Sequence, residues 1–135
     1  MRHRIRALAA AALAATVALT ATAALAALAA SGCARKVETF GAPLSPGPAI
    51  AIADIFSDPG AHEGRTVKLE GTIETECPAG CWLNVADPTG VLFVELSAAG
   101  IALPQRVGRK VAVEGVVVAE KGRPVSIRGR GVEIR

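Results

Sequence analysis

The sequence is poor in the aromatic and titratable side chains that usually carry out chemistry. It has no tyrosine, one tryptophan, three phenylalanines, two histidines and three cysteines in 135 residues. His3 belongs to the first few residues, so His62 is the only histidine left for the rest of the chain. One histidine with no residue to orient it cannot make a catalytic triad, and no set of nucleophile, base and acid is apparent. We therefore expect a protein that is not an enzyme.

The first 32 residues have the pattern of an export signal. Arg2, Arg4 and Arg6 precede a long run of Ala, Leu, Thr and Val, which ends in Ala-Ser-Gly before Cys33. A basic start, an apolar stretch and small residues at its end are typical of a signal peptide. The run is also long enough to span a bilayer if it were kept, so an uncleaved anchor is the alternative.

Ala30 to Cys33, "ASGC", resembles the lipobox of bacterial lipoproteins. The resemblance implies cleavage before Cys33, a diacylglycerol on its thiol, and an acyl chain such as palmitate on the new amine. Two or three such chains hold a protein firmly at a membrane, because each buried methylene adds about 0.8 kcal/mol. The expected location is the cell envelope, with a lipid anchor. Ala34, where an Asp is absent, suits passage to an outer membrane facing the periplasm, in a cell that has one.

Loss of the signal changes the charge balance. The whole chain has 15 Lys and Arg against 12 Asp and Glu, a net charge of +3. The three arginines at positions 2, 4 and 6 supply this excess, so the part from Cys33 has 12 residues of each sign and is neutral. A neutral surface gives no general attraction to phosphate backbones, which argues against nucleic acid. A small ligand or an envelope protein remains as the partner, and we expect a monomer.

The chain after the signal divides into three parts. Residues 33–48 contain the lipidated cysteine and a segment with three prolines, two glycines and no regular period, which predicts a flexible tether. Residues 49–58, "AIAIADIFSD", predict one short helix that Pro59 and Gly60 stop. Its apolar residues Ile52, Ile55 and Phe56 share one face. The folded domain is expected to cover residues 49–135.

From Gly64 onward, apolar and polar residues alternate with a period of two. Four runs show this pattern, at 66–76, 81–96, 110–120 and 124–134. The second run contains the turn sequence Asp87-Pro88-Thr89-Gly90 and therefore predicts a hairpin. Five short strands in about 70 residues are enough for one small barrel or sandwich.

Two of the runs repeat one another. The sequence "GRTVKLEGTI" from Gly64 matches "GRKVAVEGVV" from Gly108 at the glycines, the arginine, an apolar pair and a glutamate. Each copy places a glycine in mid-strand, at Gly71 and Gly115. Glycines inside strands are typical of the bends at the corners of a small closed barrel. The prediction is an all-β fold, a five-stranded OB-fold-like barrel with a short N-terminal helix.

Two resemblances support this fold. The segments "LEGTI", "NVADPTGVLFVEL" and "GRKVAVEGVV" resemble OB domains of the tRNA-anticodon-binding type. The segments "FGAPL", "VKLEG", "CPAGCWLNV", "LPQ" and "VAVEG" resemble more closely a family of exported bacterial proteins, known only as a domain of unknown function with a C-x-x-x-C-W core. This second resemblance spans nearly the whole mature chain. It implies a barrel fold and an exported location, and brings no activity with it.

Cys77 and Cys81, in "CPAGC", are the only cysteines after Cys33. They fall in the loop between the first two barrel strands, which in OB folds frames the ligand face together with the loop between strands four and five. A disulfide that orders this loop is the interpretation we favour. An oxidising compartment, an even count and the turn residues between the two cysteines all support it.

Two other states of the cysteine pair remain open. Two thiolates and a histidine suit copper, so Cys77, Cys81 and His62 could form a metal site in a copper-binding or copper-delivery protein. The C-x-x-x-C spacing is similar to that of the copper-delivery proteins of cytochrome oxidase assembly. Thiol–disulfide exchange is disfavoured, because Glu74 and Glu76 oppose thiolate formation and no helix begins at Cys77.

The hairpin register places four residues on one outer face. If Ala86 pairs with Val91, the residues pointing outward together are Trp82, Asn84, Phe93 and Glu95. Nucleic-acid-binding OB folds stack bases on aromatics there, so these four are candidates for ligand binding, with nucleic acid or an oligosaccharide as weaker possibilities. We favour a packed face instead, in which the N-terminal helix covers both rings through Ile55 and Phe56. Arg128 and Arg130, in the last strand, are expected to form a solvated face rather than an anion patch.

Overall fold

The computed structural model describes residues 36–135. The two repeated sequences pair with one another. They form β2 (Thr66–Glu76) and β5 (Lys110–Val118). The two strands run antiparallel, with Val67 opposite Gly115 and Gly71 opposite Val111. Each mid-strand glycine therefore faces the first apolar residue of the other copy.

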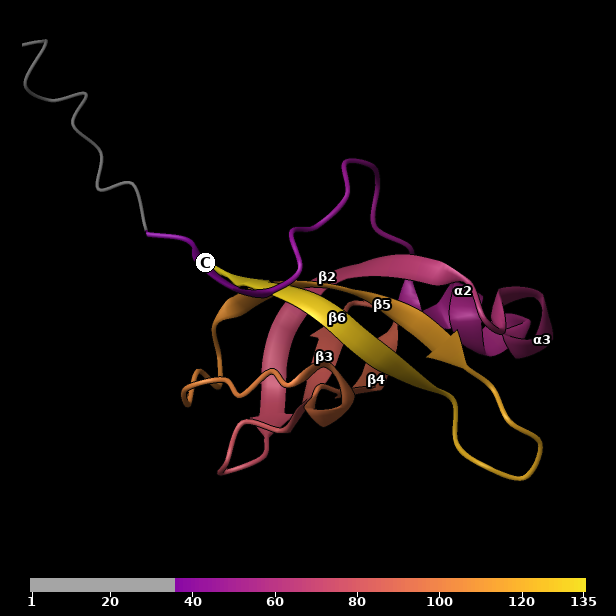
Figure 1. Cartoon of the computed structure of the whole chain (residues 1–135). Helices are drawn as coiled ribbons and strands as arrows, with labels where there is room; N and C mark the ends of the chain where they lie inside the picture. Colours follow the sequence, from indigo (N-terminus) through magenta and orange to yellow (C-terminus); the bar gives the residue numbers. More distant parts are fainter. Residues whose placement is uncertain (1–35) are drawn as a thin grey trace, which may run out of the picture. The chain divides into compact units, whose positions relative to one another are not determined.

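Three further strands close the barrel. They are β3 (Trp82–Asp87), β4 (Gly90–Glu95) and β6 (Ser126–Ile134). The strand order is β6-β4-β3-β2-β5, and an antiparallel pairing of β5 with β6 joins the two ends (Figure 1). The only parallel contact joins β4 to β6, at Val94 and Glu95. The predicted all-β, OB-fold-like barrel is confirmed, and β2, β3 and β4 begin and end close to where the sequence places them.

The mid-strand glycines lie where the barrel wall is tightest. A Cβ on Gly71 would lie 2.3 Å from the carbonyl oxygen of Ala86, and a Cβ on Gly115 would lie 2.4 Å from that of Arg128. Gly71 directly precedes the point where β2 begins to pair with β3, since Thr72 pairs with Ala86 of β3 as well as with Lys110 of β5. Only a residue without a side chain allows the two backbones to approach this closely.

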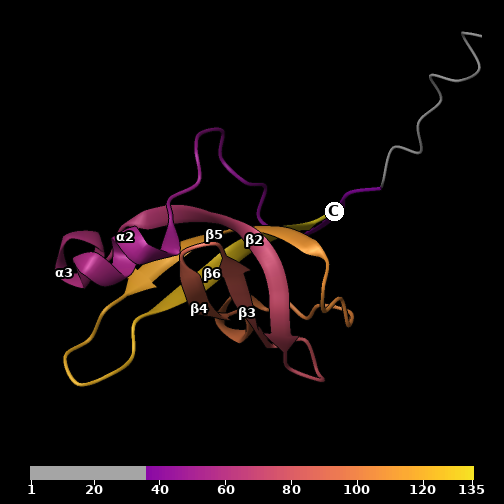
Figure 2. The ribbon, with the colours of Figure 1, turned by 180° about the vertical axis from the view of Figure 1, so that it is seen from behind.

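Two short helices lie at one end of the barrel (Figures 1 and 2). They are α2 (Ile52–Ser57) and α3 (Pro59–His62), in place of the single helix predicted over 49–58. Pro59 does not stop the helical segment but occupies the first position of α3, and Asp58 accepts a hydrogen bond of 3.0 Å from the Ala61 N–H. Proline favours this position because it has no N–H to satisfy. No helix within residues 36–135 is both long and apolar enough to cross a membrane.

The core is entirely aliphatic. Ile52 and Ile55 of α2 are fully buried and close one end of the barrel. Leu96, just after β4, is also fully buried, and the strands supply most of the other large buried side chains, among them Leu69, Ile73, Leu83, Val85, Leu92, Val94, Val113, Ile127 and Ile134. Burial at alternate positions of β3 and β4 leaves the other positions of this hairpin facing outward.

Part of the segment 33–48, which the sequence predicts to be a flexible tether, packs against the barrel. Glu38–Gly41 forms β1, which pairs antiparallel with β6 from Ile134 to Gly131. The chain then crosses the barrel, and the Ser45 N–H donates a hydrogen bond of 2.9 Å to Glu114, a residue that is 3% exposed. A buried carboxylate is stable only when hydrogen-bond donors surround it. The hydrogen bond to Glu114 therefore holds the proline-rich segment around Ser45 against the barrel, although this segment has no regular secondary structure. The tether prediction is therefore wrong from Glu38 onward, and Cys33 lies outside the described residues.

Candidate functional site

The β3–β4 hairpin carries an aromatic pair on its outer face, in which Trp82 is partly buried and Phe93 is exposed. Ala86 pairs with Val91, Asn84 with Phe93 and Trp82 with Glu95, as the hairpin sequence predicts. The ring centroids of Trp82 and Phe93 are 5.6 Å apart, with the rings tilted by 37°. Such offset, tilted pairs stabilise one another beyond the area that they bury.

The polar members of this face are held by their neighbours. The Asn84 side-chain amide donates a hydrogen bond of 2.8 Å to Thr75 on β2. The Glu95 carboxylate accepts hydrogen bonds from the hydroxyl of Ser97 and from the Ala98 N–H. These bonds, together with the positive charge of Arg128, outweigh the effect of burial and hold the pKa of Glu95 below its usual value. The carboxylate thus stays charged beside the aromatic pair.

The N-terminal helix does not cover these rings, which corrects the interpretation favoured from the sequence. Phe93 is 38% exposed and Phe56 is 47% exposed. The reason is that α2 is fixed at the turn end of the hairpin: the Ile52 N–H donates to the Asp87 carboxylate at 2.9 Å, and the Ala53 N–H donates to the Thr89 hydroxyl at 3.0 Å. From there Ile52 and Ile55 point into the barrel, and Phe56 lies at its rim.

A shallow pocket of about 230 Å³ adjoins Phe93 and Glu95, where β6 separates from β4. Its other wall comes from the loop between β5 and β6 and from the start of β6, including Arg123, Ser126 and Arg128. Arg123 pairs with Glu120 at 2.7 Å. The OB-fold prediction places the loop between the fourth and fifth barrel strands at the ligand face, and Glu120 and Arg123 of that loop line this pocket. The parallel contact of β4 with β6 adds Arg128, which the sequence does not place there.

Arg128 and Arg130 have different surroundings. Arg130 binds the buried carboxylate of Glu114 and the hydroxyl of Ser45. Arg128 is exposed and makes no ion pair with the residues from 36 onward. Arg128 is thus the cation at this pocket that is free to meet an anionic group.

The cysteine loop joins β2 to β3 and is docked on the segment after β4. The Gly80 N–H donates to the Cys77 carbonyl at 2.8 Å, which makes a tight turn. The Leu103 N–H donates to the Gly80 carbonyl at 3.1 Å, and the Gln105 side chain donates to the Cys77 carbonyl at 2.9 Å. Cys77 is buried and Cys81 is partly exposed, directly before Trp82.

The two sulfurs interact, and their titration differs. Both cysteines are free thiols in this structure. A hydrogen bond from the Cys81 thiol, with backbone N–H groups of Cys81, Ala79 and Gly80, lowers the pKa of Cys77. The interaction with the Cys77 thiol and partial burial raise the pKa of Cys81. The sequence misses this asymmetry, because the stabilising amides belong to the loop itself and not to a helix.

His62 does not join the cysteines. It ends α3, which precedes β2, whereas the cysteine loop follows β2, and Figures 1 and 2 place the two on opposite sides of the barrel. In the region that the structure describes, no three His, Cys, Asp or Glu side chains are grouped so that they could hold a metal ion. The three-ligand copper site suggested by the sequence is therefore not assembled.

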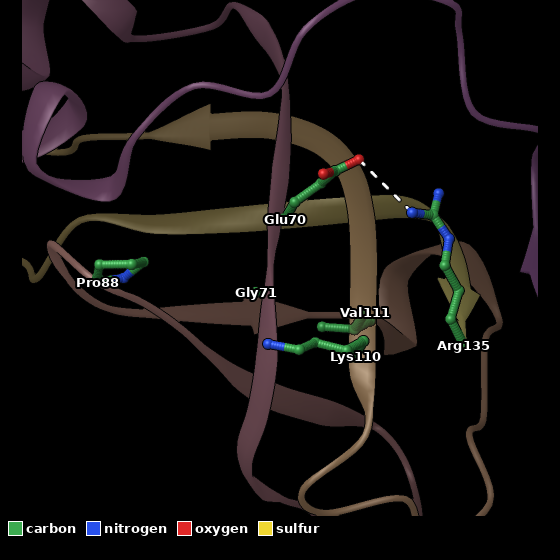
Figure 3. A pocket seen from close by; sticks show the side chains of 6 residues that line it. All are labelled: Glu70, Gly71, Pro88, Lys110, Val111 and Arg135. Carbon is green, nitrogen blue, oxygen red and sulfur yellow. Dashed lines mark ion pairs between the residues drawn. The ribbon is translucent and has the colours of Figure 1, made fainter.

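A second pocket, of about 350 Å³, lies on another part of the barrel (Figure 3). Glu70, Lys110 and Arg135 carry charges around it, and Glu70 is 4.0 Å from the guanidinium of Arg135. Lys110 donates a long hydrogen bond of 3.4 Å to Thr72. No aromatic side chain lines this pocket. None of the residues of the Trp82 face lines it.

Comparison with known proteins supports the fold alone. No protein-family model and no curated protein matches the sequence. Among solved structures, the chain is similar to the hypothetical protein ygiW from E. coli, with a TM-score of 0.54 and 16% sequence identity. The match covers 70% of this chain and 99% of that one. At this identity the likeness shows that the two chains share a barrel fold.

Proposed function

We propose that this chain is a non-catalytic binding module of the bacterial cell envelope, tethered to a membrane by lipid on Cys33. Its ligand face is the outer surface of the β3–β4 hairpin. The observation that carries the proposal is the Trp82–Phe93 pair, whose rings contact each other while Phe93 stays 38% exposed beside a pocket. In a chain with only four aromatic residues, an aromatic pair left open to solvent favours binding over packing.

A disulfide between Cys77 and Cys81 is part of this proposal. Its support is the effect of each thiol on the pKa of the other and the oxidising compartment that the export signal implies. The loop leads directly into Trp82, and the Leu96 N–H donates to the Cys81 carbonyl at 2.9 Å. A covalent link at this point would fix the end of the hairpin from which Trp82 projects.

Trp82 is the only tryptophan, so its fluorescence reports on the proposed face without labelling. The purified full chain is titrated with three probes, namely chitotetraose, a 15-residue oligothymidylate and a mixture of random octapeptides. We expect one of these to shift the Trp82 emission and Phe93→Ala to weaken that binding about tenfold, because a contacting aromatic is lost. Lys110→Gln, in the pocket of Figure 3, should bind as the unaltered chain does. A face that responds to none of the probes would overturn the proposal.

A further inference from the structure

The strand β4 has an open edge next to the aromatic pair. One side of β4 pairs with β3 over its whole length, from Gly90 to Glu95. The other side pairs with β6 only at Val94 and Glu95. Within the region that the structure describes, Gly90–Phe93 therefore has a strand on one side and none on the other. An open edge of this kind can pair with another chain.

The direction of the main-chain groups follows from one hydrogen bond. The Leu96 N–H donates to the Cys81 carbonyl, on the β3 side. Bonding alternates along an antiparallel pair, so Leu92 and Val94 also turn their N–H groups toward β3. The N–H groups of Val91 and Phe93 then point away from β3, into the gap where β6 has separated. The side chains of these two residues are 39% and 38% exposed.

The gap has recognisable ends and walls. β6 begins at Ser126, which pairs with Val118 of β5, and it pairs with β4 only at Ile127 and Arg128. Pro124, just before β6, lines the pocket and has no N–H to offer β4. At the other end lies Phe56, with a ring carbon 3.9 Å from where a Cβ on Gly90 would be. Of the four aromatic residues in the sequence, three lie around this gap and the hairpin beside it.

We infer that this gap binds an extended peptide segment of another envelope protein, which adds a strand to the open edge of β4. The inference rests on the proposed function and names its ligand class. Main-chain groups at Val91 and Phe93 would pair with the peptide backbone, and alternate peptide side chains would contact Phe93 and Val91. Arg128, which has no ion-pair partner from residue 36 onward, would take a carboxylate of the peptide.

A peptide fits these features better than the other ligand classes. Nucleic acid calls for a run of cations along its backbone, whereas Glu95 and Glu120 balance Arg123 and Arg128 at this pocket. A saccharide would use the rings but leave the strand edge unpaired. A peptide uses the rings, the edge and the exposed guanidinium of Arg128 together.

The first test is peptide selection followed by hydrogen exchange on the full chain. Random octapeptides displayed on phage are selected against the purified protein, and the enriched peptides are synthesised. We expect alternating apolar residues with an acidic residue, and slower exchange of the Val91 and Phe93 amides when peptide is bound. Leu92 and Val94 are internal controls, because their amides already face β3. If Val91 and Phe93 are protected in the free chain, or stay unprotected with peptide bound, the inference is wrong.

A pair of variants separates strand addition from binding through side chains. Val91→Pro removes an N–H that the barrel does not use, whereas Val91→Thr keeps it with a similar branched shape. We expect Val91→Pro to weaken the selected peptide at least about tenfold and Val91→Thr to leave it nearly unchanged. Arg128→Gln should weaken acidic peptides alone.

The outcomes also distinguish this inference from the proposed function. If a probe shifts the Trp82 emission and binds Val91→Pro as tightly as Val91→Thr, the proposed ligand face is supported. The same result would overturn the inference that the peptide adds a strand to β4. Failure of the selection to yield any binding peptide would overturn it as well. Should Val91→Pro not fold, the exchange of the Val91 and Phe93 amides still decides the matter.

Discussion

Cys77 and Cys81 lie close enough for each thiol to shift the pKa of the other, and the two pKa shifts have opposite directions. Loop amides and the Cys81 thiol lower the pKa of Cys77, while Cys81 holds its proton more tightly. The two thiols thus influence each other while both are free. A thiolate next to a thiol is the arrangement from which a disulfide forms under oxidising conditions.

We predict that the chain purified from its envelope carries a Cys77–Cys81 disulfide. Intact-mass measurement with and without reduction and alkylation should show a deficit of two hydrogens in the unreduced form. Reduction should lower the melting temperature only slightly, because a loop of five residues restricts the unfolded chain little. Free thiols that bind about one Cu(I) tightly, with the binding lost in Cys77→Ser, would contradict the disulfide and restore copper as a ligand.

Membrane attachment is predicted to depend on Cys33. Expression of the full chain should give a mature protein that begins at Cys33, carries acyl chains and partitions into detergent. Cys33→Ser should remove the lipid, so that once residues 1–32 are cleaved off the protein stays in the aqueous phase, because the anchor then depends on those chains. Cys77→Ser is the matched control and should still partition into detergent. A Cys33→Ser protein that stays in the membrane after cleavage of its signal would contradict this prediction.

Gly71 and Gly115 are predicted to be positions where an added methyl group is poorly tolerated. Gly71→Ala and Gly115→Ala should each destabilise the barrel by about 3 kcal/mol or more, because the new Cβ would meet a backbone carbonyl oxygen at 2.3 or 2.4 Å. Gly60→Ala is the control: its Cβ would meet no atom closer than 3.7 Å, and we expect a change within about 1 kcal/mol. Urea unfolding of the three variants measures these differences. Equal stability of all three would refute the corner role of the two glycines.

Much of the barrel could be predicted from the sequence because its signals are local. Alternation fixes β2 and β3, the Asp87-Pro88-Thr89-Gly90 turn fixes the hairpin register, and this register places Trp82 and Phe93 on one outer face. The repeated glutamates, Glu70 and Glu114, show the limit of such reasoning. They occupy equivalent positions in the two copies, yet one is exposed and the other buried.

The parts that the sequence misses depend on contacts between distant segments. β1 forms because it pairs with the edge of β6. The segment around Ser45 is held by Glu114, which lies 69 residues further along the chain. In the same way, Arg128 reaches the ligand face only through the parallel contact of β6 with β4. The place of α2 depends on the Asp87 carboxylate, so apolar periodicity alone assigns Phe56 to the wrong surface.

Glu114 is predicted to make the stability of the barrel depend on pH in the acidic range. Burial alone would raise its pKa, but hydrogen bonds from Arg130 and Ser45 outweigh burial and lower it. Because the folded state has the lower pKa, the stabilisation is complete above the unfolded value near 4.5 and is lost as the pH falls through the folded value. Glu114→Gln should therefore cost about 1–3 kcal/mol at pH 7 and flatten the fall in stability below pH 4.5. Glu70→Gln, at the equivalent exposed position, should change little. Urea unfolding of both variants from pH 3 to pH 7 provides the measurement, and matching curves for the two would show that the buried carboxylate has no such effect.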